Sequence, residues 1–305
     1  MFNILKKTFY SNGKLLLTGE YAVLDGAKAF ALPTKFGQSL HTEFSGNDRL
    51  YWKSFDADGS IWYEDTILIN EIKNNSYKGE NFITKQLTEI LYSAHNTNPK
   101  ILNTGYNVIT ELTFPRKWGL GTSSTLINNI AQWFGIDAYQ LLWKSFGGSG
   151  YDIACAQNDS AILYRIENEL SVVIPVNFKP EYADKLYFVY LNQKQDSRKA
   201  IVTYREKKGD IADAIGKITV ITDEIYQAKT INDFSVLLEE HEAVMTEILG
   251  IPTIKKLLFP DFKGTLKSLG AWGGDFILAV AEDNPADYFN KKGYDTVIPY
   301  NEMIL

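Results

Sequence analysis

Residues 115–125 (PRKWGLGTSST) constrain the chain most, because they combine two glycines with a run of hydroxyl side chains and lead straight into the apolar-periodic residues 126–134. That periodicity predicts a helix. Glycines let backbone N–H groups approach an anion closely, and a helix start supplies unpaired N–H donors and the positive end of the helix dipole. Arg116 and Lys117 add positive charge beside the loop. The sequence therefore predicts a phosphate-binding loop at a helix start.

A tight loop-to-helix connection is the alternative for this segment, since glycines are common turn residues. The chain contains neither Gly-x-x-x-x-Gly-Lys-Ser/Thr nor Gly-x-Gly-x-x-Gly. The P-loop and the Rossmann phosphate site therefore lack their sequence signatures. A phosphate site here would be a different arrangement of the same physical elements.

Composition narrows the class of protein. The 305 residues suffice for two domains, each with its own core, and a net charge of −6 argues against a general nucleic-acid binder. One cysteine, Cys155, excludes an intrachain disulfide and a cysteine-based zinc site, and His41, His95 and His241 lack metal-ligand spacing. No apolar run reaches the length of a membrane span, and the N-terminus lacks a signal-peptide pattern. We expect a cytoplasmic protein with no nucleic-acid or membrane partner.

Hydrophobic periodicity and turn residues predict a mixed order of strands and helices. Strands are expected at 8–17 in two pieces around residues 11–13, at 27–45 in short runs broken by Pro33 and Gly37, at 51–69 with an Asp58-Gly59 turn, and at 103–114, 186–191 and 276–281. Helices are expected at 81–95, at 137–145 with Asp137 as N-cap, and at 205–249 as two helices separated near residues 232–233. Strands and helices without strict alternation favour an α+β fold.

Two more glycine clusters lie beside acidic residues. Residues 147–150 (GGSG) precede Asp152, and residues 270–275 (GAWGGD) precede an apolar strand. A carboxylate at position 152 could accept a proton from a substrate hydroxyl, as phosphoryl transfer can require. Asp152 could equally be the N-cap of the following helix. From the residues alone both interpretations stand.

Lys14, Glu20 and residues 197–199 also have two interpretations each. Lys14 precedes three leucines and could serve a site or be a solvated lysine, and Glu20 could be functional or form a structural ion pair. Residues 197–199 (SRK) could bind an anionic substrate group or form a solvated charge run. His241 lies in an amphipathic helical pattern, which predicts a packed or hydrogen-bonded histidine.

Taken in order, these segments resemble the GHMP kinase superfamily, which includes galactokinase, homoserine kinase, mevalonate kinase and phosphomevalonate kinase. Residues 13–26 (GKLLLTGEYAVLDG) are similar to the first family motif, residues 115–125 to the second, usually Pro-x-x-x-Gly-Leu-Gly-Ser-Ser-Ala, and residues 270–275 to the third. The resemblance extends over nearly the whole chain with its motifs in the family's order. Three motifs in order are more specific than any one.

The resemblance implies a role for each candidate residue. Asp152 would be the base for the attacking oxygen or would orient it, and Lys14 would lower the pKa of that oxygen and offset charge in the transition state. The loop would wrap the triphosphate of ATP, with Ser124 near Mg²⁺, through Lys117, Gly119, Leu120, Gly121, Thr122, Ser123 and Ser124. The acceptor substrate would be bound by Glu20, Ser149, Gly150, Ser197, Arg198, Gly270, Ala271, Gly273, Gly274 and Asp275.

Details of the motifs favour the mevalonate-pathway branch, and phosphomevalonate kinase in particular. GEYAV in the first motif, GSGYDIA around Asp152 and GGD in the third are similar to that branch. Mevalonate kinase usually carries a magnesium-binding glutamate shortly before the loop of its catalytic aspartate. The corresponding residues 139–145 of this chain (YQLLWKS) contain no acid, which weakens the mevalonate kinase interpretation and leaves the magnesium site incomplete. Asn12 and Thr122 stand where the family usually has other residues, and Trp272 stands where it usually has glycine. An indole at position 272 would narrow the pocket, which implies either a changed substrate or a loss of activity.

The resemblance implies a two-domain α+β GHMP kinase fold. Residues 1–170 would form an ATP-binding domain like ribosomal protein S5 domain 2, and residues 171–305 a ferredoxin-like domain. The implied activity is MgATP-dependent phosphorylation of a small phosphorylated or hydroxy-acid metabolite of isoprenoid biosynthesis. The first expected acceptor is 5-phosphomevalonate and the second is mevalonate, followed by diphosphomevalonate decarboxylase or sugar kinase activity. An inactive nucleotide-binding relative is the alternative of another class. A homodimer is compatible with the resemblance.

Overall fold

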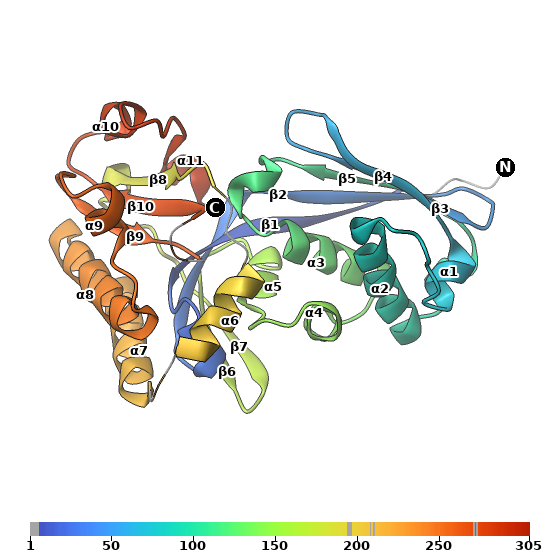
Figure 1. Cartoon of the computed structure of the whole chain (residues 1–305), viewed down its shortest axis with the longest axis horizontal. Helices are drawn as coiled ribbons and strands as arrows, with labels where there is room; N and C mark the ends of the chain where they lie inside the picture. The colour runs from blue at the N-terminus through green and yellow to red at the C-terminus, as the bar shows by residue number, and fades with distance from the viewer. Residues whose placement is uncertain (1–5, 194–196, 208, 210, 271, 273) are drawn as a thin grey trace. The chain divides into compact units, whose positions relative to one another are not determined.

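The computed structural model describes residues 6–193, 197–207, 209, 211–270, 272 and 274–305 (Figure 1). The chain divides into two compact units. Unit 1 consists of Met1–Gly13, Phe36–Arg116 and Leu120–Gln157, and unit 2 of Lys14–Lys35, Lys117–Gly119 and Asn158–Leu305. The chain passes between the units inside its first two strands and inside the glycine loop, so neither unit is one continuous stretch. The expected boundary at residue 170 stays a prediction.

Unit 1 consists of strands with helices packed against one face. Its elements are the beginning of β1 (Lys7–Thr18), most of β2 (Ala29–Phe44), β3 (Arg49–Phe55), β4 (Ile61–Leu68), α1 (Ile69–Lys73), α2 (Phe82–Thr97), β5 (Tyr106–Leu112), α3 (Thr122–Phe134), α4 (Ala138–Ser145) and α5 (Tyr151–Ala156). β2 and β5 are antiparallel, β3 and β5 are parallel, and β3 and β4 form the expected hairpin.

The core of unit 1 lies between this sheet and its helices, which Figure 1 shows side by side. Along β5 buried and more exposed residues alternate, as in a sheet with one covered face. Trp52 and Val108 from the strands pack with Leu91, Ile127 and Phe134 from α2 and α3. Burial of each such large apolar side chain contributes about 1.5–3 kcal/mol. This packing fixes α3, whose first turn follows the glycine loop.

The prediction of broken strands at 8–17 and 27–45 is wrong, because β1 and β2 are continuous. Pro33 cannot donate a hydrogen bond, but its carbonyl accepts one from Leu305 N–H at 3.3 Å. Gly37 is a point of close packing rather than a break, since a Cβ there would lie 2.3 Å from the carbonyl oxygen of Ser11. Pairing with neighbouring strands thus overrides the local signals.

Unit 2 contains a four-stranded antiparallel sheet and most of the second half of the chain. Its elements are the end of β1, the start of β2, a 3₁₀ turn (Ala22–Asp25), β6 (Ile162–Glu167), β7 (Leu170–Pro175), β8 (Leu186–Tyr190), α6 (Ser197–Lys207), α7 (Ala212–Gln227), α8 (Ile231–Leu249), α9 (Ile254–Leu258), β9 (Thr265–Ser268), β10 (Phe276–Val280), α10 (Ala286–Asn290), β11 (Val297–Pro299) and α11 (Tyr300–Met303). The strand order in this sheet is β11-β8-β10-β9.

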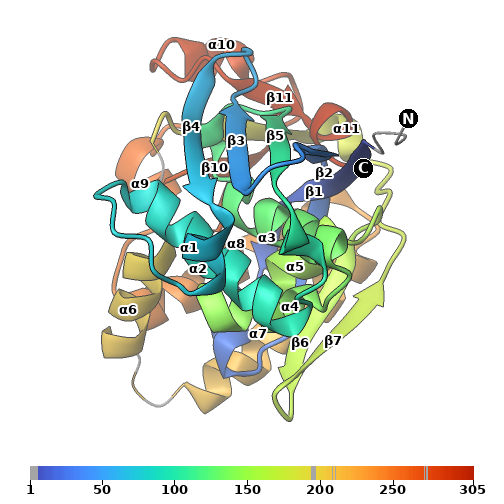
Figure 2. The same cartoon turned by 90° about the vertical axis from the view of Figure 1, so that its right-hand side faces the viewer.

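Helices and a hairpin complete unit 2. α7 and α8 pack against each other, and α8 also contacts β9. The hairpin of β6 and β7 is seen plainly in Figure 2. The two helices predicted over 205–249 are present as α7 and α8, but they separate at residues 228–230 rather than near residues 232–233: Asp233 lies in the first turn of α8, and Thr230 is its N-cap. The other predicted helices and strands are present, with small differences at their ends, and the α+β fold class is confirmed.

Candidate functional site

The glycine loop ends at the N-terminus of α3, as the sequence predicts. Gly121 is the N-cap residue and has φ 97°, a conformation that favours glycine. The first N–H groups of a helix have no acceptor within the helix and carry its positive dipole end. Ser124 Oγ donates to Gly121 O at 2.9 Å, and its side chain is buried. The first backbone N–H groups of α3 are therefore the donors that an anion at this helix end would meet.

One hydroxyl in this turn is unsatisfied. Thr122 Oγ1 is buried and has no hydrogen-bond partner among the described residues. A buried hydroxyl without a partner costs about 1–3 kcal/mol, and a phosphate oxygen could satisfy it. Among the neighbouring positions, Ser123 is exposed and Leu120 is buried. The first turn of α3 therefore fits a phosphate group physically, and the nucleotide contacts of these residues stay predictions.

Asp152 is in the first turn of α5 but is not its N-cap. Gly150, with φ 93°, is the N-cap residue, so the N-cap interpretation of Asp152 is wrong. The Oδ1 atom of Asp152 accepts from Ile153 N–H at 3.1 Å. α5 packs against α3 within unit 1, and Gln157 Nε2 donates to Asn128 Oδ1 at 2.9 Å. The carboxylate at position 152 is thus half-buried on a helix that α3 supports.

Ser149 and Gly150, two predicted substrate-binding residues, are both buried at this turn. Gly150 supplies the left-handed backbone from which α5 starts, and Ser149 is about 7% exposed. Their place directly before Asp152 is consistent with a substrate loop. The contact with substrate stays a prediction.

Lys14 and the start of the glycine loop come together in unit 2. Lys14 Nζ donates to Gly119 O at 2.9 Å, and the lysine is half-buried. It is therefore not a simple solvated lysine. Lys117 is exposed at its side chain, but its carbonyl accepts from the Tyr190 hydroxyl at 3.0 Å. These contacts attach residues 117–119 to β1 and β8.

Asp275 lies directly against Gly119. A Cβ on Gly119 would be 2.3 Å from the carboxyl carbon of Asp275, so this approach requires glycine. Asp275 N–H donates to Gln193 O at 2.8 Å, and its carbonyl accepts from Leu191 N–H at 2.8 Å. The predicted residues Lys14, Gly119 and Asp275 thus lie in one neighbourhood of unit 2.

Trp272, at the usual glycine position of the third motif, is a buried aromatic residue. It packs in a cluster with Tyr21 and Tyr204, whose rings are stacked with centroids 5.4 Å apart. The backbone of Trp272 is hydrogen-bonded to the Tyr21 hydroxyl, and burial raises the pKa of that hydroxyl. The indole Nε1 of Trp272 has no partner among the described residues. The indole therefore joins the third glycine segment to the first.

Several predicted positions fall outside the described residues. These are Ala271, Gly273 and the side chains of Ser197 and Arg198, although α6 begins at Ser197. Gly270 has φ 65°, and Gly274, shortly before β10, is buried. Substrate contacts at all six positions stay predictions.

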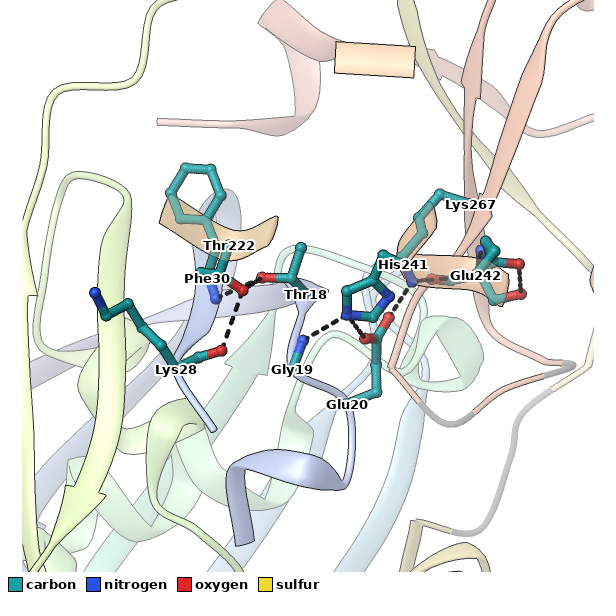
Figure 3. Close-up of polar contacts among 10 residues, drawn as sticks. Thr18, Gly19, Glu20, Lys28, Phe30, Thr222, His241, Glu242 and Lys267 are labelled. Carbon is teal, nitrogen blue, oxygen red and sulfur yellow. Dashed lines mark hydrogen bonds and ion pairs between the residues drawn. The ribbon is translucent and has the colours of Figure 1, made fainter. Parts of the chain in front are cut away.

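Glu20 is fully buried in a cluster of charged groups that Figure 3 shows. Lys267, on β9, is ion-paired with Glu20 Oε1 and lies 3.2 Å from Glu242 Oε1, on α8. His241 Nε2 accepts from Gly19 N–H at 3.0 Å and lies 3.4 Å from Glu20 Oε2. We call Glu20, His241, Glu242 and Lys267 the Lys267 cluster. Glu20 forms the structural ion pair foreseen as one interpretation, and a direct contact with substrate stays a prediction.

Burial sets the direction of the pKa shifts of Glu20, His241 and Glu242. Desolvation raises the pKa of Glu20 to about 7 despite the opposing charge of Lys267. Burial also raises the pKa of Glu242, and burial together with Lys267 lowers the pKa of His241 well below its ordinary value. Because Gly19 N–H donates to Nε2, the neutral imidazole carries its proton on Nδ1. Desolvation opposes the charge of Lys267, but the two carboxylates outweigh it and raise the pKa of the ammonium group.

The Glu20 titration makes a testable contribution to stability. A carboxyl whose pKa is about 7 when folded and 4.5 when unfolded stabilises the fold fully below pH 4.5, and this contribution is lost as pH rises through 7. Glu20→Gln removes this titration but leaves that of His241. We therefore expect the stability difference between wild type and Glu20→Gln to shrink by about 1–3 kcal/mol from pH 4.5 to pH 8. Thermal unfolding of both proteins across this range measures it, and parallel curves would contradict it.

Sequence reasoning missed Lys267 and Glu242. The only signal was a lysine between Leu266 and Leu269, and it was weak, because a lysine is rarely fully buried unless paired. Its partner Glu20 is 247 positions away, so nothing local identified the pair. The prediction that His241 is packed and hydrogen-bonded is confirmed.

Magnesium was expected at Ser124. In the part of the chain that the structure describes, no three His, Cys, Asp or Glu side chains gather as metal ligands. Mg²⁺ bound with a nucleotide usually takes one or two protein ligands together with phosphates and water. The Ser124 hydroxyl, in the first turn of α3, has spare lone pairs for such a role.

No described helix is long and apolar enough to cross a membrane.

Comparison with known proteins places this arrangement in a fold class. No protein-family model and no curated protein sequence matches the chain. Solved structures of small-molecule kinases match nearly its whole length. The chain therefore has the GHMP kinase fold.

Three solved structures show the extent of the likeness. A Lin0012 protein from Listeria innocua has a TM-score of 0.73 at 18% identity, with 97% of each chain covered. The mevalonate kinase of Methanococcus jannaschii has a TM-score of 0.68 at 18% identity, with 96% of this chain and 97% of that chain covered. A Streptococcus pneumoniae phosphomevalonate kinase, in complex with phosphomevalonate and AMPPNP, has 0.69 at 14% identity, with 94% and 95% covered. At these identities the comparison establishes the fold.

Proposed function

We propose that this protein is an ATP-dependent small-molecule kinase whose acceptor is 5-phosphomevalonate. The observation that carries the proposal is the start of α3, in a GHMP kinase fold. A glycine N-cap, backbone N–H groups without acceptors in the helix and the unsatisfied Thr122 hydroxyl are together suited to bind phosphate there. The sequence details around Asp152 and in the first and third motifs support the choice of acceptor.

In this proposal each candidate residue has one role in phosphoryl transfer. The first turn of α3 binds the phosphates of the nucleotide, and Ser124 holds Mg²⁺. Bound MgATP would supply the phosphoryl group and partial neutralisation of its charge. Asp152 orients the attacking oxygen of the acceptor and takes its proton where it has one. Lys14, fixed by its hydrogen bond to Gly119 O, lowers the pKa of that oxygen and offsets negative charge.

A second candidate is a nucleotide-binding relative without kinase activity. The buried Trp272 indole favours it, because it fills a position where the family usually has glycine. Against it, the sequence retains all three of Lys14, Ser124 and Asp152. A protein that no longer transferred phosphate would have no need of all three.

The test is an assay of purified protein with MgATP and one acceptor at a time: 5-phosphomevalonate, mevalonate, 5-diphosphomevalonate, galactose or homoserine. We expect ADP and, in equal amount, a product heavier by one phosphoryl group with 5-phosphomevalonate. Turnover with another acceptor would correct the substrate. ATP binding without ADP formation on any acceptor would support the inactive relative instead.

A further inference from the structure

Burying the Lys267 cluster costs desolvation free energy. It contains two carboxylates, an ammonium group and an imidazole, and its four side chains are at most 3% exposed. Buried ion pairs gain little net stability, because desolvation offsets the Coulomb attraction, and apolar residues often stabilise a core as well or better. Stability alone therefore gives no reason for a lysine on β9. The contacts of the cluster with the backbone point to another role.

One side of the cluster holds the first glycine segment, residues 19–26. His241 Nε2 accepts from Gly19 N–H, and Lys267 binds the side chain of the next residue, Glu20. Tyr21 follows with φ 54°, an uncommon conformation for an aromatic residue. Gly19 cannot be replaced, because a Cβ would lie 2.7 Å from the Cβ of Ala29. The cluster thus sets a strained turn.

The other side of the cluster holds the strand that leads into the third glycine segment, residues 270–275. Lys267 Nζ donates to Ser268 O at 2.5 Å. Glu242 Oε1 accepts from Ser268 N–H at 3.1 Å, and Glu242 Oε2 is 3.2 Å from Ser268 Oγ. Gly270 follows two residues later. One lysine therefore contacts Glu20, in the first glycine segment, and Ser268, in the strand just before the third.

We propose that Lys267 is a positioning residue, which fixes the first glycine segment against the third through Glu20 and thereby shapes the acceptor side of the site. Glu20 then acts through the backbone of residues 19–21. The link between Tyr21 and the backbone of Trp272 is a second connection between the same two segments. The kinetic consequence rests on the kinase function proposed above; the structural consequence does not.

Amide hydrogen exchange tests the structural consequence without any substrate. The variants are Glu20→Gln and Lys267→Met. The matched control is Lys28→Met, which removes another lysine ion pair of unit 2, that of Lys28 with Asp223 at 2.6 Å. We expect exchange of residues 19–24 and 268–270 to rise about tenfold or more in the two cluster variants and to stay unchanged in the control.

The exchange result decides the proposal in each case. Protection retained in both segments of Glu20→Gln, or lost equally in Lys28→Met, would overturn it. Lys267→Met leaves two buried carboxylates without a cation and can fail to fold. In that case Glu20→Gln, which keeps Lys267 paired with Glu242, and the complementary Glu242→Gln supply the measurement. Loss of protection in only one of the two segments would also contradict the coupling.

Kinetics with MgATP and 5-phosphomevalonate test the second consequence. In Glu20→Gln we expect KM for the acceptor to rise roughly tenfold, with KM for ATP within about twofold of wild type, since only the acceptor side is displaced. A merely structural role would lower the melting temperature and leave both KM values unchanged. If wild type phosphorylates no acceptor, the proposed function fails, and the exchange experiment still decides the role of Lys267.

Discussion

Replacement of Asp152 by asparagine is expected to lower kcat by roughly 10²–10⁴-fold and to leave the fold intact. The carboxylate is needed to orient or deprotonate the attacking oxygen, and asparagine keeps its shape without its charge or basicity. The structure removes the main competing explanation for this residue, because α5 is capped by Gly150 rather than by Asp152. The substitution therefore removes no N-cap residue, and asparagine keeps an oxygen that can accept from Ile153 N–H.

The matched control is Asp137→Ala in the same unit. Asp137 is the N-cap of α4, where its Oδ1 accepts from Gln140 N–H at 2.9 Å. Loss of this cap is expected to cost about 1 kcal/mol of stability with little change in kcat. ADP formation at saturating MgATP and acceptor, with thermal unfolding of each variant, separates the two effects. Full kcat in Asp152→Asn would remove Asp152 from the chemistry.

The helices of the fold were predictable because their signals are local. Asp137 caps α4 through its own side chain, and α2 follows Asn81, whose side chain accepts from Ile83 N–H and Thr84 N–H. The continuity of β1 and β2 was not predictable. Gly37 N–H donates to Thr113 Oγ1 at 2.8 Å, a contact across 76 positions that no window of sequence contains. Pairing with neighbouring strands keeps β1 and β2 continuous although glycine and proline locally favour a break.

The site divides in the same way. The glycine loop, Asp152 and Lys14 could be found from short patterns, since each pattern reports its own local backbone. Short patterns could not reveal the Lys267 cluster, because its members come from the turn after β1, from α8 and from β9, and meet only in the folded unit. The N-cap interpretation of Asp152 also failed for a local reason. Gly150 can adopt the left-handed conformation, and the helix therefore starts two positions further upstream than an N-cap at Asp152 would place it.

Gly119→Ala is expected to lower kcat/KM about 100-fold, a loss typical of displacing catalytic groups by about 1 Å. Its φ of 70° costs an alanine about 1–2 kcal/mol, and the new Cβ would meet the carboxyl group of Asp275 at 2.3–2.5 Å. The backbone of Asp275 is held at its N–H and its carbonyl, so the new Cβ displaces the Asp275 carboxyl group, residues 117–119, or both. Either movement disturbs the site: the first moves a predicted substrate-binding carboxylate, and the second moves the carbonyl to which Lys14 Nζ donates.

Gly135→Ala is the matched control for backbone strain. Gly135 ends α3 with φ 65°, close to that of Gly119, but a Cβ there would meet nothing within 4 Å. Gly135→Ala should therefore lower stability by about 1 kcal/mol or slightly more and Gly119→Ala by at least that amount, whereas only Gly119→Ala should lose activity. Steady-state kinetics and thermal unfolding of the two variants measure this. Equal kcat/KM in both would mean that Lys14 does not depend on the carbonyl of Gly119 for its position, and the role of Lys14 in the transition state would then rest on its charge alone.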